Sequence, residues 1–188
     1  MKNTIIVFAL LITFNLFAAD KWAGKAAPGF DIPDQHGIFH TLKDYKGKWL
    51  VLYFYPKDDT PGCTTEALNF SKDYKTIQDM GAEIVGASLD DIESHKKFAD
   101  KHNIPFTLLA DKDEIMSTAY DVVKKVPLMH YAKRQTFIID PNGIVAKFYE
   151  DVTASSHSKE VINDLTQLIS KAKLSKADIS TNGFEKDK

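Results

Sequence analysis

The residues able to do chemistry in this chain gather around Cys63, its only cysteine, in the segment 56–66, PKDDTPGCTTE. The apolar run Trp49–Tyr55 comes before this segment, and a stretch with helical spacing follows it from Thr64 to Met80. The first N–H groups of a helix lack internal partners, and the helix dipole places partial positive charge there. Both effects favour the thiolate, which is the nucleophilic form of cysteine. The spacing therefore predicts a reactive thiol at a strand-to-helix turn.

The alternative interpretation is that Cys63 is a small buried hydrophobic residue, which is common for a lone cysteine. Its neighbours favour the reactive interpretation. Pro56 can end the preceding strand, Pro61 stiffens the turn, and Gly62 allows another group to approach the backbone closely. Thr60 places a hydroxyl three residues before the sulfur.

Three of these residues, Pro56, Thr60 and Cys63, match the peroxiredoxin pattern P-x-x-x-[TS]-x-x-C. The wider run YPKDDTPGCTTEA resembles the bacterioferritin-comigratory (PrxQ) branch of the AhpC/TSA thioredoxin-like superfamily, and the resemblance extends over residues 26–171. It implies a peroxidase of the thioredoxin-dependent type that reduces hydrogen peroxide and organic hydroperoxides. That function belongs to antioxidant defence and cell redox homeostasis, and it needs neither a metal nor an organic cofactor.

The resemblance also implies the other residues of the site. Arg134 is the only arginine, and its segment RQTFIID resembles the family run in which an arginine lies beside the active thiol. Arginine suits this role because it stays charged and offers a rigid fork of donors, whereas the alternative is a surface charge at a strand entrance. Thr60 is expected to bond thiolate and peroxide, and Pro56 to shield the pocket from water. Gly62 and Glu66 are expected to line the pocket, with Glu66 either in a polar network around Arg134 or simply a charge in the first helical turn.

The remaining polar candidates receive structural interpretations. The six histidines show no metal-ligand spacing such as H-E-x-x-H, and we interpret all of them as solvated or packing residues. Asp58 and Asp59 are interpreted as a solvated loop pair that borders the pocket.

Recycling of an oxidised Cys63 needs a thiol from outside the chain, because no second cysteine exists. Many PrxQ-type chains carry a resolving cysteine five residues after the first, where this chain has Leu68. The expected reductant is a small thiol, or a thioredoxin-like or glutaredoxin-like protein, and the expected oligomeric state is a monomer or weak dimer.

A thiol–disulfide oxidoreductase is an alternative, but it normally needs C-x-x-C, and the two partner positions hold Thr60 and Glu66. A redox sensor that signals through oxidised Cys63 is the non-enzymatic alternative.

Composition limits the remaining functional classes. The chain has 188 residues, 44% of them apolar, which is enough for one domain with a substantial core. Its formal net charge is −2 and no basic stripe is present, so nucleic acid is not an expected partner.

The domain prediction divides the chain into three parts. Residues 1–19 combine Lys2 with a short apolar run, which is typical of a secretory signal peptide cleaved near Ala18-Ala19. Residues 20–172 form the thioredoxin-like domain, and residues 173–188 form a polar, disordered tail. The expected location is therefore periplasmic or secreted, without stable membrane association once the signal is removed; an uncleaved membrane anchor is the alternative.

The order of predicted elements indicates the fold. Strands are expected over 49–55, 82–89 and 106–110, and helices over 64–80, 91–102 and 115–120, before a hairpin at Pro141-Asn142-Gly143 and a last helix. A short hairpin is expected near residues 30–42. This alternation implies an α/β protein, and the family resemblance implies a thioredoxin-like three-layer α/β/α sandwich with a mixed central sheet and an N-terminal β-hairpin.

Overall fold

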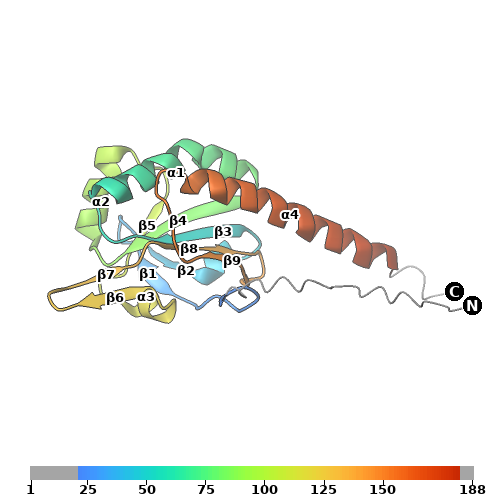
Figure 1. The fold of residues 1–188 in the computed structure, drawn as a ribbon, viewed down its shortest axis with the longest axis horizontal. Helices are drawn as coiled ribbons and strands as arrows, with labels where there is room; N and C mark the ends of the chain where they lie inside the picture. Colours follow the sequence, from blue (N-terminus) through green and yellow to red (C-terminus); the bar gives the residue numbers. More distant parts are fainter. Residues whose placement is uncertain (1–20, 183–188) are drawn as a thin grey trace, which may run out of the picture.

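A five-stranded mixed sheet runs through the centre of the protein (Figure 1). The structure is a computed structural model and describes residues 21–182. The strand order is β5-β4-β3-β8-β9, in which β3, β4 and β5 are parallel while β8 runs antiparallel to both β3 and β9. The strands are β3 (Trp49–Phe54), β4 (Ala82–Ser88), β5 (Thr107–Ala110), β8 (Gln135–Ile139) and β9 (Val145–Tyr149).

Strand β3 is central in the sheet, and this position explains its unbroken apolar sequence. Every one of its residues is buried, because both faces of a covered sheet exclude water. Alternate side chains enter two separate cores: Val51 and Tyr53 join one, while Leu52 and Phe54 join the other. The two cores correspond to the two faces of the sheet.

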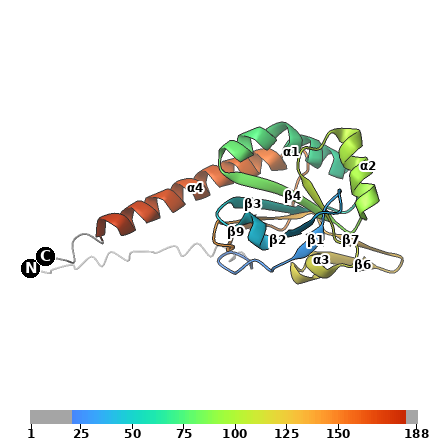
Figure 2. The ribbon, with the colours of Figure 1, turned by 180° about the vertical axis from the view of Figure 1, so that it is seen from behind.

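Three helices cover the first face, as Figures 1 and 2 show from opposite sides. They are α1 (Pro61–Asp79), α2 (Ile92–His102) and α4 (His157–Asn182). The second core is closed by the short helix α3 (Ile115–Ala119) and the 3-10 turn η1 (Leu42–Tyr45). The predicted three-layer, thioredoxin-like sandwich with a mixed sheet is confirmed.

Two hairpins flank the central sheet. The predicted N-terminal one pairs β1 (Asp31–Pro33) with β2 (Phe39–Thr41). A second hairpin, β6 (Val123–Val126) with β7 (Met129–Ala132), was not predicted. Its sequence lacks a clear alternation of apolar and polar residues, because much of it faces solvent.

The start of α1 differs from the expected one in a way that matters for the site. Apolar spacing predicted a helix from Thr64, whereas the helix begins at Pro61 with Thr60 as the N-cap residue. Proline is favoured at the first helical position because its missing N–H would have no partner there. Cys63 therefore lies inside the first turn instead of before the helix.

The predicted second helix is present as α2, and it begins after Asp91, whose side chain accepts a hydrogen bond from the Ser94 N–H. Ile92, the first residue of this helix, is 38% exposed. Its side chain lines a surface groove together with Phe39 and Ile115. The inward face of the helix is formed by His95, Phe98 and Ala99.

The expected boundary at residue 172 does not end the last helix. Helix α4 continues through Asn182, since residues 157–182 contain neither glycine nor proline to stop it. The structure thus has a helix over 173–182, where the sequence predicted a disordered tail. The predicted signal peptide and residues 183–188 lie outside the described residues. Within the part of the chain that the structure describes, no helix combines the length and apolar character that a membrane crossing requires.

Candidate active site

Cys63 lies in the first turn of α1, just after the end of β3. It is a free cysteine and only 1% exposed. The N-cap residue Thr60 and the first helical residue Pro61 come directly before it. At this position the unpaired backbone N–H groups and the helix dipole favour a negative charge on sulfur.

Arg134 reaches the same place from the position just before β8. Strand β8 runs antiparallel to β3 with Gln135 opposite Phe54, so the residue before Gln135 lies beside the end of β3. Nη2 of Arg134 donates a hydrogen bond to Cys63 Sγ over 3.2 Å. The Arg134 side chain is 20% exposed, so water shields this interaction only in part. A permanent cation is thus fixed at the sulfur.

Glu66 holds the other arm of the guanidinium. Its Oε2 accepts a hydrogen bond from Nη1 of Arg134, whereas its Oε1 is buried without a hydrogen-bond partner. Burial raises the pKa of Glu66 to about 7, although the neighbouring Arg134 acts in the opposite direction. Glu66 and Cys63 lie three residues apart on α1 and share one face, so one cation serves two acidic groups.

Gly62 leaves room for this arrangement. A Cβ atom at this position would lie 3.2 Å from Nη2 of Arg134, which is tighter than ordinary van der Waals contact. The absent side chain therefore lets the guanidinium approach the first turn of α1. Pro56 is half-buried and begins the loop, 56–60, that connects β3 to α1.

Thr60 lies in this loop, and its hydroxyl makes a hydrogen bond within the loop. Its Oγ1 donates to the carbonyl oxygen of Lys57 over 3.0 Å. The sequence predicted a bond from this hydroxyl to the thiolate, and the structure instead uses its hydrogen within the loop. The lone pairs of the Thr60 oxygen remain available to accept a hydrogen bond.

A surface hollow of about 510 Å³ adjoins the outer side of Arg134. Its lining is largely polar and comes from β6, the first residue of β8 and the two residues before it, and the segment after β9. The lining residues are Lys124, Lys133, Arg134, Gln135, Glu150, Asp151 and Val152.

One polar group near the site was missed by the sequence analysis. Asp58 was expected to be solvated, but it is only 7% exposed and its Oδ2 lies 2.8 Å from Nδ1 of His95. The prediction for Asp58 is wrong because the loop folds against α2. The one signal available was the place of His95 three residues before Phe98, on the inward face of an amphipathic helix.

Among the described residues, one group brings three ligand atoms close enough for a metal ion: Asp58, Asp90 and His95, whose atoms lie within 4.8 Å of one another. These atoms already serve hydrogen bonds inside the protein. Both ring nitrogens of His95 have partners, and each carboxylate accepts from neighbouring hydroxyl groups. The group is therefore satisfied as a hydrogen-bond network.

Comparison with known proteins identifies the family of this chain. The AhpC/TSA family model matches residues 23–148. Peroxiredoxin Bcp of Bacillus subtilis (strain 168) is 41% identical over 152 residues, which span 79% of this chain and 97% of that protein. A structure of Xanthomonas campestris peroxiredoxin Q has a TM-score of 0.71 at 35% identity and covers 74% of this chain and 91% of the other. A PrxQ mutant of Xylella fastidiosa has a TM-score of 0.73 at 33% identity, covering 77% and 95%.

These matches extend over the fold and the whole segment that carries the site. Cys63, Glu66 and Arg134 all lie within the residues that the family model matches. The chain therefore belongs to the AhpC/TSA family and is a peroxidase of the peroxiredoxin class.

Proposed function

We propose that the protein reduces hydrogen peroxide and organic hydroperoxides through Cys63 alone, by a one-cysteine mechanism. The thiolate attacks one peroxide oxygen, so that an S–O bond forms as the O–O bond breaks. Sulfur gives up two electrons and becomes a sulfenic acid, while the leaving oxygen takes a proton and departs as water or an alcohol. The observation that carries the proposal is the 3.2 Å hydrogen bond from Arg134 to the sulfur at a helix start.

Each residue of the site has a role in this scheme. Arg134 stabilises the thiolate and then the charge that develops on the leaving oxygen. Thr60 accepts a hydrogen bond from the hydroperoxide O–H, since its own hydrogen is used by Lys57. Gly62 leaves space for the guanidinium, and Glu66 orients it. Pro56 shields the thiol from water.

Recycling uses an external thiol. The thiol sulfur attacks the sulfenic sulfur of Cys63, releasing water and forming a mixed disulfide. A second thiol then reduces that disulfide and returns Cys63 to its starting state. The absence of a second cysteine supports this scheme, and the reductant is a small thiol or a thioredoxin-like or glutaredoxin-like protein. The working form is a monomer or weak dimer.

The two alternatives use the same thiol differently. A thiol–disulfide oxidoreductase would need a second cysteine beside Cys63, and the neighbouring positions carry Thr60 and Glu66. A redox sensor would be oxidised once and then read by a partner. Repeated turnover with an external thiol distinguishes the enzyme from the sensor.

The apolar segment 1–19 supports a proposed location outside the cytoplasm. It would act as a signal peptide that is removed on export to the periplasm or the exterior. There the enzyme would contribute to antioxidant defence and redox homeostasis.

The test of the chemistry is a single-turnover reaction. Reduced protein is mixed with one equivalent of hydrogen peroxide or of an organic hydroperoxide, and the loss of thiol is followed together with intact mass. We expect one oxygen atom on Cys63 and one peroxide consumed per chain. Cys63→Ser should consume none, and peroxide loss in that variant at the wild-type rate would contradict the proposal.

A further inference from the structure

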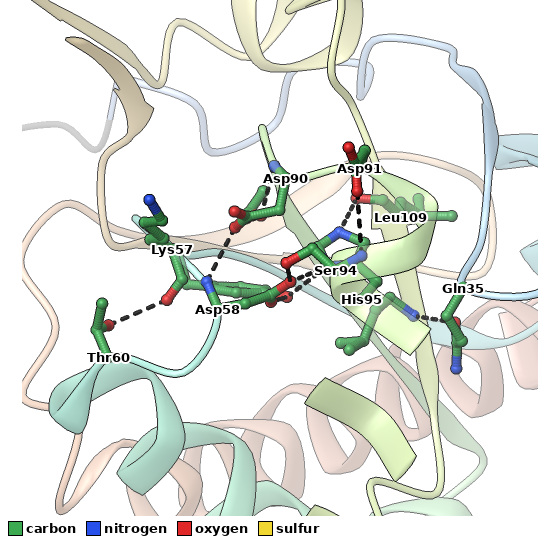
Figure 3. A network of polar contacts seen from close by, with 12 residues as sticks. Gln35, Lys57, Asp58, Thr60, Asp90, Asp91, Ser94, His95 and Leu109 are labelled. Carbon is green, nitrogen blue, oxygen red and sulfur yellow. Dashed lines mark hydrogen bonds and ion pairs between the residues drawn. The ribbon is translucent and has the colours of Figure 1, made fainter. Parts of the chain in front are cut away.

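A buried polar network connects the loop 56–60 to the first turns of α2 (Figure 3). Its five members, called here the Asp58–His95 network, are Tyr55, Asp58, Asp90, Ser94 and His95. The mechanism described above uses none of them. The inference drawn from the network rests on the proposed function.

Asp58 is the centre of the network. Its carboxylate accepts hydrogen bonds from Tyr55 Oη over 2.8 Å and from Ser94 Oγ over 2.7 Å, and its Oδ2 lies 2.8 Å from His95 Nδ1. Asp58 is 7% exposed and His95 is fully buried. A buried carboxylate with this many donors is held firmly, because breaking any one bond leaves a buried polar atom without a partner.

The partners of His95 determine where its protons lie. Nε2 lies 3.0 Å from the carbonyl oxygen of Leu109, which can only accept, so this nitrogen carries a hydrogen. The contact between Nδ1 and Asp58 Oδ2 then needs a second proton, because two lone pairs would otherwise face each other. One proton therefore lies between Asp58 Oδ2 and His95 Nδ1.

The network reaches Thr60 through a single peptide group. The Asp58 N–H donates to Asp90 Oδ2 over 2.9 Å, and Asp90 Oδ2 also accepts from Ser88 Oγ. The carbonyl of the same peptide group, that of Lys57, accepts the hydroxyl hydrogen of Thr60. Asp90 thus fixes this peptide group through its N–H, and the carbonyl of the same group orients the Thr60 hydroxyl.

We propose that Asp58 and His95 are positioning residues for the peroxide reaction: they hold the loop 56–60 so that the Thr60 oxygen presents its lone pairs to the bound hydroperoxide. Cys63 itself is held separately by Arg134 and the helix start. Loss of the network should therefore slow peroxide attack while the thiolate remains reactive toward reagents that do not need Thr60. This separation distinguishes positioning from a contribution to folding alone.

The chain offers a matched control on the same loop and the same helix. Asp59 follows Asp58, and its Oδ1 lies 2.8 Å from His102 Nε2, while Lys101 also pairs with it. This second acid–histidine pair is at the surface: the side chains of Asp59 and His102 are 46% and 18% exposed. Asp59→Asn and His102→Gln thus make the same chemical changes as Asp58→Asn and His95→Gln, but outside the buried network.

The experiment measures two second-order rates of Cys63 in all five proteins: oxidation by hydrogen peroxide and alkylation by iodoacetamide at the same pH. We expect Asp58→Asn and His95→Gln to slow oxidation by at least about tenfold, with alkylation within about twofold of wild type. Both rates should stay within about twofold in Asp59→Asn and His102→Gln, as is usual for surface changes.

Three results would overturn the inference. Folded Asp58→Asn and His95→Gln with the wild-type oxidation rate would show that the network does not act on the reaction. Parallel loss of both rates would show that it holds the thiol or the fold instead. If these two variants do not fold, Ser94→Ala removes one donor to Asp58, and the inference fails if this variant does not slow oxidation selectively. A wild type that peroxide does not oxidise would instead refute the proposed function, and with it the inference.

Discussion

Nη2 of Arg134 lies 3.2 Å from the sulfur of Cys63, although the two residues are 71 positions apart in the chain. The antiparallel pairing of β8 with β3 brings them together, because it places Gln135 opposite Phe54 at the end of the strand that leads into α1. The contact joins two sources of positive potential, the helix start and the guanidinium, at one sulfur.

Replacement of Arg134 by methionine tests the contribution of the guanidinium. The substitution keeps much of the length of the side chain and removes the charge and both donors. We expect peroxide oxidation of Cys63 at pH 7 to slow by at least about tenfold, which corresponds to about 1.4 kcal/mol of lost stabilisation. Alkylation by iodoacetamide should slow as well, because the thiolate is less favoured. Lys133→Met is the control, and equal rates in the two variants would refute the role of Arg134.

Thr60→Val tests whether the Thr60 hydroxyl acts on the bound peroxide without affecting the reactivity of the Cys63 thiolate. The hydroxyl that accepts from the hydroperoxide is lost, so oxidation should slow by about tenfold while alkylation stays within about twofold. Stability should change little, because Thr60 makes no side-chain capping hydrogen bond in the structure. Thr65→Val is the matched control, since the Thr65 hydroxyl also donates to a backbone carbonyl, that of Pro61. A wild-type oxidation rate in Thr60→Val would exclude a role for the hydroxyl.

Glu66 makes the stability of the protein depend on pH in a particular direction. Its folded-state pKa of about 7 lies above the ordinary value of 4.5, so between these pH values the folded protein holds a proton that the unfolded chain has released. This contribution to the free energy of unfolding is fully present below pH 4.5 and is lost as the pH rises toward 7. It amounts to at most about 3–4 kcal/mol, at about 1.4 kcal/mol per pKa unit.

The measurement is urea unfolding of the reduced protein at several pH values. From pH 4.5 to pH 7, the unfolding free energy of wild type should fall relative to that of Glu66→Gln. Glu93 is at an exposed position on α2, so the unfolding free energy of Glu93→Gln should change with pH in the same way as that of wild type. If the curve for Glu66→Gln is also parallel to wild type, burial of Glu66 does not control its protonation.

The single cysteine predicts how turnover stops. Without a thiol donor, each chain should reduce one hydroperoxide rapidly and then stall, with no internal disulfide in the intact mass. Addition of an external thiol should restore turnover. Excess peroxide should instead add a second oxygen to Cys63, because an unresolved sulfenic acid is oxidised further to sulfinic acid. Sustained turnover by wild type without any thiol would show that the recycling scheme is wrong.

The N-terminal segment carries a prediction about processing. Protein recovered from the extracytoplasmic fraction of a bacterial host should begin near Asp20, because residues 1–19 have the charge and apolar pattern of a signal peptide. Edman sequencing or intact mass measures this directly. An intact Met1 in protein from the soluble cytosolic fraction would contradict it.

Much of this protein could be predicted from local patterns. The apolar run of β3, the amphipathic spacing of α1 and α2 and the turn at Pro141-Asn142-Gly143 each reflect contacts close in sequence, and each element is present. The motif around Cys63 likewise lies in one continuous segment, so its place between a strand and a helix followed from its neighbours. The hairpin β6–β7 was missed because a largely exposed hairpin imposes little pattern on its side chains.

The sequence by itself indicated a reactive thiol at a strand-to-helix turn and showed that the chain carries no second cysteine. Only the tertiary structure decided which charges meet that thiol. Strand pairing places Arg134 between Cys63 and Glu66, and the fold of the loop 56–60 against α2 buries Asp58 while Asp59 stays at the surface. Two adjacent aspartates carry no local signal that distinguishes them, because burial depends on contacts with residues more than thirty positions away in the chain.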